Sequence, residues 1–359
     1  MRSIPNSPTT SRHNRMAVLI LLAVATLSLP ALAQKVDVTY LTSDISGVGS
    51  FNDTNLVNPW GMSNSPSGPW WISDEGTGVS TLYNAAGQPQ SLVVTIPPAM
   101  GTGRGTPTGT VYNGTSSFQI HGIAAQFLFC TFDGTISGWY TATTAFIAVN
   151  NNPSGAIYTG MALASAGGAN YIYVTNIHSG AVEVYDGTFQ PHTFSAGQFT
   201  DSSIPSGYTP FNIQLVGNSL VVTFAKQNAS HNFVVPGPGN GYVDIFDTQG
   251  NLQLRLAHNL FLNAPWGAVR APSNFSGFAN DLLIGNFGSG SIAAFNISTG
   301  AWIGNALNAS DLAVQIDGLW GLTFGNGGSG GPTNTLFFTG GTFGGVHGIF
   351  GTITPHPGM

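Results

Sequence analysis

Several Asn and Asp residues stand at the ends of short apolar segments, where their side chains could hold a metal ion. The segments WWISD (70–74), YIYVTN (171–176) and LLIGN (282–286) end in Asp74, Asn176 and Asn286. Carboxylate and amide oxygens suit a hard cation such as Ca²⁺, which takes roughly six to eight oxygen ligands. Asn and Asp also cap the turns that end strands, so a purely structural role stays open.

Two acidic neighbours, Asp74 and Glu75, are the candidates for a general base beside such a cation. Glu75 is one of only two glutamates in the chain. The sequence contains no nucleophile elbow, phosphate-binding loop or Cys-x-x-Cys pair, so nothing in it supports covalent catalysis, nucleotide hydrolysis or thiol redox chemistry. Cys130, the single cysteine, lies in FLFCTF and is expected to be a buried small hydrophobe. Whether the chain is an enzyme is left open by these residues.

The apolar segments belong to a repeat that must position these polar side chains. The repeated unit opens with a phrase such as LVNPWGMSN (56–64), LNAPWGAVR (262–270) or DGLWGLTFG (317–325), and an apolar segment follows. Three more apolar segments bring the count to six: FLFCTF (127–132), LVVTF (220–224) and LFFTG (336–340). Most are followed by an aromatic residue, then Asn or Asp, then Gly. Those residue types tolerate the positive φ of tight turns between strands.

The spacing of the units predicts an all-β fold, a six-bladed β-propeller. The units begin near residues 58, 106, 158, 208, 263 and 317, so each is about 50 residues long. Such units are typical of propeller blades, which are four-stranded sheets around a channel. A β-sandwich would show short turn intervals without this longer period. The sixth unit lacks a last strand, and we expect VDVTYL (36–41) to complete it and so close the ring.

In a propeller, the PWG phrases lie where the outer strand of one blade leads into the inner strand of the next. We expect Trp60, Trp266 and Trp320 to pack as wedges between blades, and the glycine to permit close approach at the axis. Residues at these crossovers and at the ends of the second strands should meet at one mouth of the channel. The predicted mouth residues are Asn58, Asn176, Asn263, Asn286 and Asp317. The predicted metal ligands are Asp74, Asn176, Asn286 and Asp317.

The fourth unit carries an insertion, AKQNASHNFVVPGPGNG (225–241), between its second and third strands. We expect it to extend over the mouth as a lid or a recognition loop, or to be a decorative insertion. Four histidines do not occupy equivalent places in the repeat, so a four-histidine iron site is not expected. They are His121, His178, His231 and His347.

The unit resembles the NHL-type propeller repeat. More closely, residues 34–359 are similar to a family of exported bacterial proteins in which NPWG opens the first blade. The similar segments are NPWGMSN, WWISDEGTGVSTLYN, YVTNIHSGAVEVYDG, GYVDIFDTQGNL, APWGAV and DGLWGLTFGNG. The resemblance implies a propeller and export, and it supplies no activity. Many relatives carry a C-terminal Pro-Glu-Pro sorting tail, whereas this chain ends in TPHPGM, which favours release.

The N-terminal segment predicts export. It carries Arg2, Arg12 and Arg15, then the apolar run 16–29 and Ala31-Leu32-Ala33, the pattern of a signal peptide cleaved after Ala33. The remaining 34–359 form one propeller domain. This part keeps five basic and all 14 acidic residues, a formal charge of −9, which argues against nucleic acid or an anionic membrane as partner. No later stretch is apolar for long enough to span a bilayer.

Together these features favour an exported monomer, extracellular or periplasmic. Its expected role is to bind an extracellular small molecule, a glycan or a protein. The alternative is a calcium-dependent hydrolase, because propeller lactonases and phosphotriesterases of the gluconolactonase and paraoxonase type, which this architecture resembles, build their site at the same mouth. In that case Ca²⁺ would polarise a carbonyl or phosphoryl oxygen, and Asp74 or Glu75 would assist as base.

Overall fold

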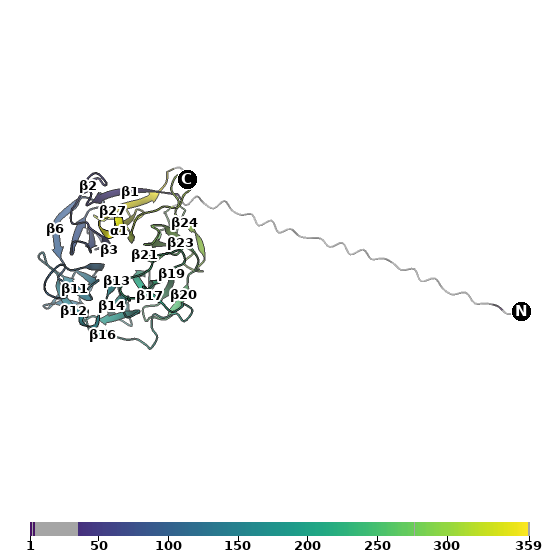
Figure 1. The fold of residues 1–359 in the computed structure, drawn as a ribbon, viewed down its shortest axis with the longest axis horizontal. Coiled ribbons are helices and arrows are strands. Elements are labelled where there is room, and N and C mark those ends of the chain that lie inside the picture. The colour runs from purple at the N-terminus through teal and green to yellow at the C-terminus, as the bar shows by residue number, and fades with distance from the viewer. Residues whose placement is uncertain (2, 4–34, 276, 358–359) are drawn as a thin grey trace. The chain divides into compact units, whose positions relative to one another are not determined.

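The structure, a computed structural model, describes residues 1, 3, 35–275 and 277–357. The predicted signal peptide and its cleavage site therefore lie outside the described residues, apart from Met1 and Ser3. From residue 35 onward the chain forms strands almost throughout (Figure 1). In this described part, no helix is both long and apolar enough to cross a membrane.

Six antiparallel sheets follow one another around a central axis (Figure 1). Blade 1 is β3 (Pro59–Asn64), β4 (Trp70–Asp74), β5 (Val79–Tyr83) and β6 (Pro89–Thr95). Blade 2 is β7 (Pro107–Tyr112), β10 (Phe127–Thr131), β11 (Thr135–Trp139) and β12 (Phe146–Asn150). Blade 3 is β13 (Tyr158–Ala166), β14 (Ala169–Asn176), β15 (Ala181–Asp186) and β16 (Pro191–His192). The prediction of an all-β, six-bladed propeller is confirmed.

The second half of the ring repeats this order. Blade 4 is β17 (Tyr208–Val216), β18 (Ser219–Lys226), β19 (Gly241–Phe246) and β20 (Leu252–Arg255). Blade 5 is β21 (Pro265–Arg270), β22 (Leu282–Asn286), β23 (Ile292–Phe295) and β24 (Trp302–Asn305). Blade 6 contains β25 (Leu319–Phe324), β26 (Leu336–Gly340) and β27 (Ile349–Pro355). The short elements are β8 (Gln119–Ile120), β9 (Ile123–Ala124), η1 (Asn152–Ser154) and α1 (Thr342–Gly345).

The first strand of each blade lines the axis and contacts the first strand of the next blade. Glycine makes this approach possible in the PWG phrases. A Cβ atom added to Gly61 would lie 2.5 Å from the carbonyl oxygen of Thr108, and one added to Gly267 would lie 2.6 Å from that of Trp320. Since real Cβ atoms do not come so near a carbonyl, the expected role of this glycine is confirmed.

The N-terminal strand completes the sixth blade, as predicted. β1 (Val36–Ser43) pairs antiparallel with β27, from Val36 opposite Pro355 to Ser43 opposite Ile349. The short β2 (Phe51–Asn52) then adds to the outside of β1 in parallel. Figure 1 shows the two ends of the ring meeting here. The pairing buries the edge of β27 that would otherwise expose its backbone groups.

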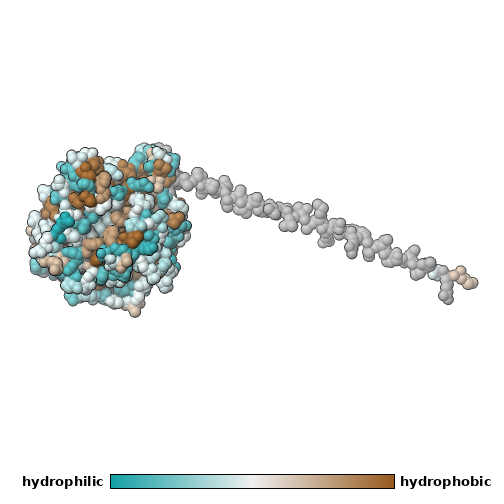
Figure 2. All heavy atoms as spheres, in the orientation of Figure 1, coloured by the Kyte–Doolittle hydropathy of each residue, from teal (hydrophilic) through white to brown (hydrophobic). Residues whose placement is uncertain are grey.

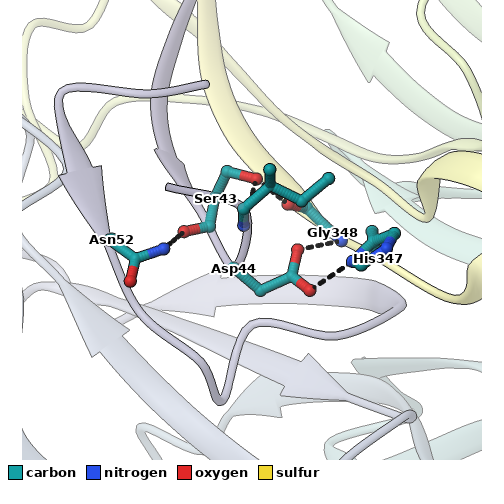
Figure 3. Close-up of polar contacts among 6 residues, drawn as sticks. Ser43, Asp44, Asn52, His347 and Gly348 are labelled. Atoms are coloured by element: carbon teal, nitrogen blue, oxygen red, sulfur yellow. Dashed lines mark hydrogen bonds and ion pairs between the residues drawn. The ribbon is translucent and has the colours of Figure 1, made fainter. Parts of the chain in front are cut away.

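Polar contacts stabilise this closure at the C-terminal end of β1 (Figure 3). Ser43 Oγ donates a hydrogen bond of 2.8 Å to the carbonyl of Gly348. Asp44 accepts one of 2.9 Å from the amide of Gly348, and its other oxygen lies 2.7 Å from Nδ1 of His347. These contacts join residues about 300 positions apart in the chain, so the closure is also the link between the two ends of the sequence.

The hydrophobic core is divided among the interfaces between neighbouring blades. One cluster, for example, joins Ile213 and Leu220 of blade 4 to Ala162 and Tyr173 of blade 3. Polar surface is supplied mainly by uncharged residues, since charged residues make up 6% of the sequence. Figure 2 accordingly shows a face of mostly pale and teal residues with small brown patches. Stability therefore depends on packing between blades.

Asp244, on β19, is a buried carboxyl group that predicts a pH-dependent stability. Both of its oxygens are buried and receive no hydrogen bond from the described residues. Burial, reinforced by the nearby charge of Asp201, raises the pKa of Asp244 from 3.8 to about 7, against an opposing effect of Arg255. Because the raised pKa favours the protonated folded form, its contribution to stability is fully present below about pH 4 and is lost as pH rises through 7.

We expect Asp244→Asn to raise the free energy of unfolding at pH 8 by up to about 4 kcal/mol and to flatten its decline between pH 5 and 8. Urea unfolding at several pH values measures both effects. Asp186→Asn is the matched control, because its hydrogen bonds lower the pKa of that turn carboxylate and place its titration below this window. Parallel stability curves for the wild type and Asp244→Asn would contradict the prediction.

Candidate functional site

A cavity of about 200 Å³ lies at one mouth of the channel. Five aromatic residues, one acid, one amide and two glycines line it: Trp60, Phe132, Phe233, Phe287, Trp320, Glu75, Asn58, Gly344 and Gly345. They come from the crossovers into the first strands, from the ends of the second strands, and from two connections in blades 4 and 6. Predominantly aromatic walls with a few polar groups are typical of a small-molecule site.

The floor of the cavity is an aromatic plug, defined as Trp60, Phe211, Trp266 and Trp320. Trp60 stacks on Trp320 with ring centroids 3.7 Å apart, and Trp266 meets Trp60 edge-on at 6.2 Å. Nε1 of Trp266 donates a hydrogen bond of 3.1 Å to the carbonyl of Thr159 in blade 3. The plug therefore connects blades that are not neighbours in the ring.

The tryptophans fill the axis of the ring and reach beyond the neighbouring blade, so the wedge role expected from the sequence describes only part of their contacts. Trp60 contacts Phe211 of blade 4, on the opposite side of the ring, with centroids 6.3 Å apart. The cause is geometric, since the innermost strands surround the axis and large rings are needed to fill the space between them.

A polar pair forms one wall of the cavity. Nδ2 of Asn58 donates a hydrogen bond of 2.8 Å to Oε2 of Glu75. Oδ1 of Asn58 in turn accepts one of 3.2 Å from Nε1 of Trp320. Asn58 has a positive φ of 47°, and its backbone N–H donates a hydrogen bond of 3.4 Å to the carbonyl of His347. The pair is thus fixed both to the plug and to the ring closure.

One repeated backbone contact explains why Glu75 reaches the cavity. In all six blades, the residue that follows the second strand donates its N–H to the carbonyl of the residue that precedes the first strand. The donors are Glu75, Phe132, Ile177, Gln227, Phe287 and Gly341, and the acceptors are Asn58, Thr106, Ile157, Gly207, Ala264 and Gly318. Three of these donor residues line the cavity, and Ile177 packs into the plug.

The insertion in blade 4 covers part of the mouth, in the place expected for it. Its Phe233 ring lies 6.3 Å from Trp60 and 6.0 Å from both Phe132 and Phe287. Oδ1 of Asn263 holds the insertion by accepting a hydrogen bond of 2.6 Å from the amide of Gly237. On the other side, α1 contributes Gly344 and Gly345, and its exposed Phe343 has a positive φ of 53°.

Asp74, the first predicted metal ligand and base, points into blade 1 and does not line the cavity. Its Oδ2 accepts hydrogen bonds from the amide and hydroxyl of Thr81, at 3.1 and 2.7 Å. Burial raises the pKa of Asp74 well above its usual range. This carboxyl group is therefore enclosed within the blade, and only its neighbour Glu75 faces the mouth.

Asn176 and Asn286 are likewise used inside their own blades. Oδ1 of Asn176 accepts from the amides of Ile157 and His178, each at 3.1 Å, and Nδ2 donates to Glu183 at 2.6 Å. Oδ1 of Asn286 accepts from the amide of Asn263 at 2.9 Å, and Nδ2 donates to Ser291. Of the predicted mouth residues, only Asn58 lines the cavity.

The predicted calcium ligands do not meet at one point. Asp74, Asn176 and Asn286 bond within three different blades, while the exposed Asp317 accepts a hydrogen bond of 2.7 Å from the amide of Phe343. In the described part of the chain, no group of three or more His, Cys, Asp or Glu residues is arranged to hold a metal ion. The residues present do not fit a calcium ion at this mouth.

Beyond the plug, the channel continues as a narrow polar chamber and a second mouth. Asn212 spans the chamber, donating a hydrogen bond of 2.8 Å to the carbonyl of Trp266. The second mouth is an open cavity of about 310 Å³ that includes Met62, Met161 and Leu215. No acidic or basic side chain of the described residues lines this second cavity, whereas Glu75 lines the first.

Comparison with known proteins identifies relatives but no established activity. No known protein family matches the chain. An uncharacterized protein of Acanthamoeba polyphaga mimivirus is 29% identical over 331 residues, covering 88% of this chain and 79% of the relative. A second uncharacterized mimivirus protein is 27% identical over 299 residues, 79% of this chain and 78% of the relative. These relatives are viral, so membership of an exported bacterial family stays a prediction.

Solved structures with the same fold are β-propellers. Virginiamycin B lyase from Staphylococcus aureus matches with a TM-score of 0.50 and 13% identity, over 90% of this chain and 99% of the lyase. A protein of unknown function from Bacteroides thetaiotaomicron matches with a TM-score of 0.54 and 10% identity, over 89% and 76%. At these identities the likeness shows the fold alone. The chain is thus a six-bladed β-propeller, a fold that it shares with virginiamycin B lyase.

Proposed function

We propose that this propeller binds a small organic molecule in the mouth cavity. The observation that carries the proposal is the cavity itself, which stays open above a plug that closes the axis. The partly buried rings of Phe132, Phe233 and Phe287 surround it, so three aromatic side chains meet at one opening and leave apolar surface uncovered there. Exposed aromatic surface of this kind indicates a binding site.

The size of the cavity favours a small molecule over a glycan or a protein. Its volume of about 200 Å³ is below the roughly 300 Å³ at which sites for drug-sized ligands begin. The Asn58–Glu75 pair supplies the few fixed polar atoms that orient such a ligand. Phe233 comes from the insertion in blade 4, so that part of the wall can adjust without disturbing a blade.

We expect Phe233→Ala to weaken ligand binding by at least about tenfold, because a buried phenyl ring contributes on the order of 1.5–3 kcal/mol. The ligands are fragments from a set of small amines, alcohols and carboxylates, selected because they change the tryptophan fluorescence and raise the melting temperature. Phe146→Ala is the matched control, since Phe146 is a partly buried ring on the outer strand β12. Fragments that bind Phe233→Ala as tightly as the wild type would contradict the proposal.

A further inference from the structure

Glu75 gives the cavity a negative charge that the fold does not require. The equivalent positions of the five other blades hold Phe132, Ile177, Gln227, Phe287 and Gly341, which make the same backbone contact and carry no charge. An acidic side chain at this point is costly beside aromatic walls unless a partner offsets its desolvation. The repeat accommodates apolar residues, a glycine and an uncharged glutamine there, so the fold itself does not require the charge of the acid in blade 1.

The protein itself offers Glu75 only a neutral partner. One carboxylate oxygen accepts the hydrogen bond from Asn58, and the other accepts none from the described residues. No basic side chain lines the cavity. Two of the basic residues are paired elsewhere, Lys35 with Asp311 and Arg255 with Asp201. The carboxylate therefore has an open position for a positive group that arrives from solvent.

The remaining walls suit the body of an organic cation better than a metal ion. A divalent metal needs several oxygen ligands, whereas Oδ1 of Asn58 is already occupied by Trp320 and the aromatic rings supply none. Aromatic rings attract cations through the negative charge of their faces, and they also pack against alkyl groups. Asp317 accepts a hydrogen bond from the amide of Phe343, next to Gly344, and so adds a second acidic side chain near the rim of the cavity.

We infer that the ligand of the mouth cavity is a small organic cation, an alkylated ammonium whose charge pairs with Glu75 and whose alkyl groups contact the aromatic walls. This inference rests on the proposed binding function and names the class of its ligand. It selects against anions, because the carboxylate would repel them without a basic residue to compensate.

Choline and its uncharged carbon analogue, 3,3-dimethylbutan-1-ol, test the inference because they share a shape and differ in charge. We expect the full chain to bind choline at least about tenfold more tightly, the combined effect of an ion pair and cation–aromatic contacts. In Glu75→Gln, which keeps the size of the side chain, the two dissociation constants should become nearly equal. Titration calorimetry or tryptophan fluorescence measures them.

Asp311→Asn is the control for the change of net charge, because Asp311 is exposed and lies away from the mouth, paired with Lys35. This variant should keep the preference for choline. Equal affinity of both probes for the wild type, or a preference that survives in Glu75→Gln, would overturn the cation inference while leaving the cavity as a binding site. If neither probe nor any fragment binds, the proposed function fails together with the inference.

Discussion

Deletion of residues 36–41 should lower the free energy of unfolding by at least about 4 kcal/mol. The deletion removes Val36 from the core and uncovers apolar side chains of β27 such as Ile353, each a loss of burial at roughly 25 cal/mol per Å². It also exposes the edge of β27 along the register from Ile349 to Pro355. Urea unfolding of the deleted and intact proteins measures the difference.

The control is a truncation after Pro355. It removes His356, whose ring lies 2.8 Å from Asp37 at the surface and whose amide bonds to the carbonyl of Lys35. Surface pairs of this kind contribute about 1 kcal/mol or less, so this protein should unfold almost as the intact one does. Equal stability of the deleted and truncated proteins would mean that β1 is not what holds the ring closed.

The fold could be predicted from the sequence because each blade repeats the same local solution. The glycine of PWG recurs since the axis is narrow in every blade, and Gly61 and Gly267 both lie against a neighbouring backbone. The missing last strand of the sixth unit could be found by counting. The segment 36–41 was the available strand, and an open ring would leave two edges exposed.

The predicted site residues lie one position before residues that line or border the cavity. In a strand, a shift of one residue moves a side chain to the opposite face of the sheet. Asp74, Asn176 and Asn286 are the last residues of β4, β14 and β22, whose side chains turn into the blades. Of the residues that follow them, Glu75 and Phe287 line the cavity and Ile177 packs against the plug. The polar residues at the strand ends were chosen because of their side-chain chemistry. Successive side chains of a strand point to opposite faces, so the residue after each of them lies on the other face.

Two of the cavity residues, Trp60 and Trp320, are ones that sequence reasoning assigned to packing. Phe132 and Phe287 are of the residue type that usually fills a core, and only the closed ring shows that they line a cavity. Phe233 belongs to an insertion whose contacts depend on tertiary structure. Glu75 could be singled out, as one of two glutamates in the chain, but its partner Asn58 depends on the crossover geometry.

Trp60→Ala should cost about 4 kcal/mol of stability, since removal of a buried Trp leaves a large cavity that its neighbours cannot fill. Trp60 is nearly fully buried and contacts five rings from four other blades, among them Trp320, Phe132 and Phe211. The indole is also the floor of the mouth cavity, so the variant should lose binding of fragments as well as stability. Urea unfolding and fluorescence titration measure the two effects separately.

Trp302→Ala is the matched control, because Trp302 lies on the outer strand β24 and is 43% exposed, with one stacked neighbour, Phe261. Its loss should cost about 1 kcal/mol and leave fragment binding intact. A similar cost for both variants would mean that the axis is not a point of tight packing. If Trp60→Ala is strongly destabilised at high urea yet still binds fragments with wild-type affinity in its native state, the ligand site lies elsewhere and the cavity only completes the packing of the ring.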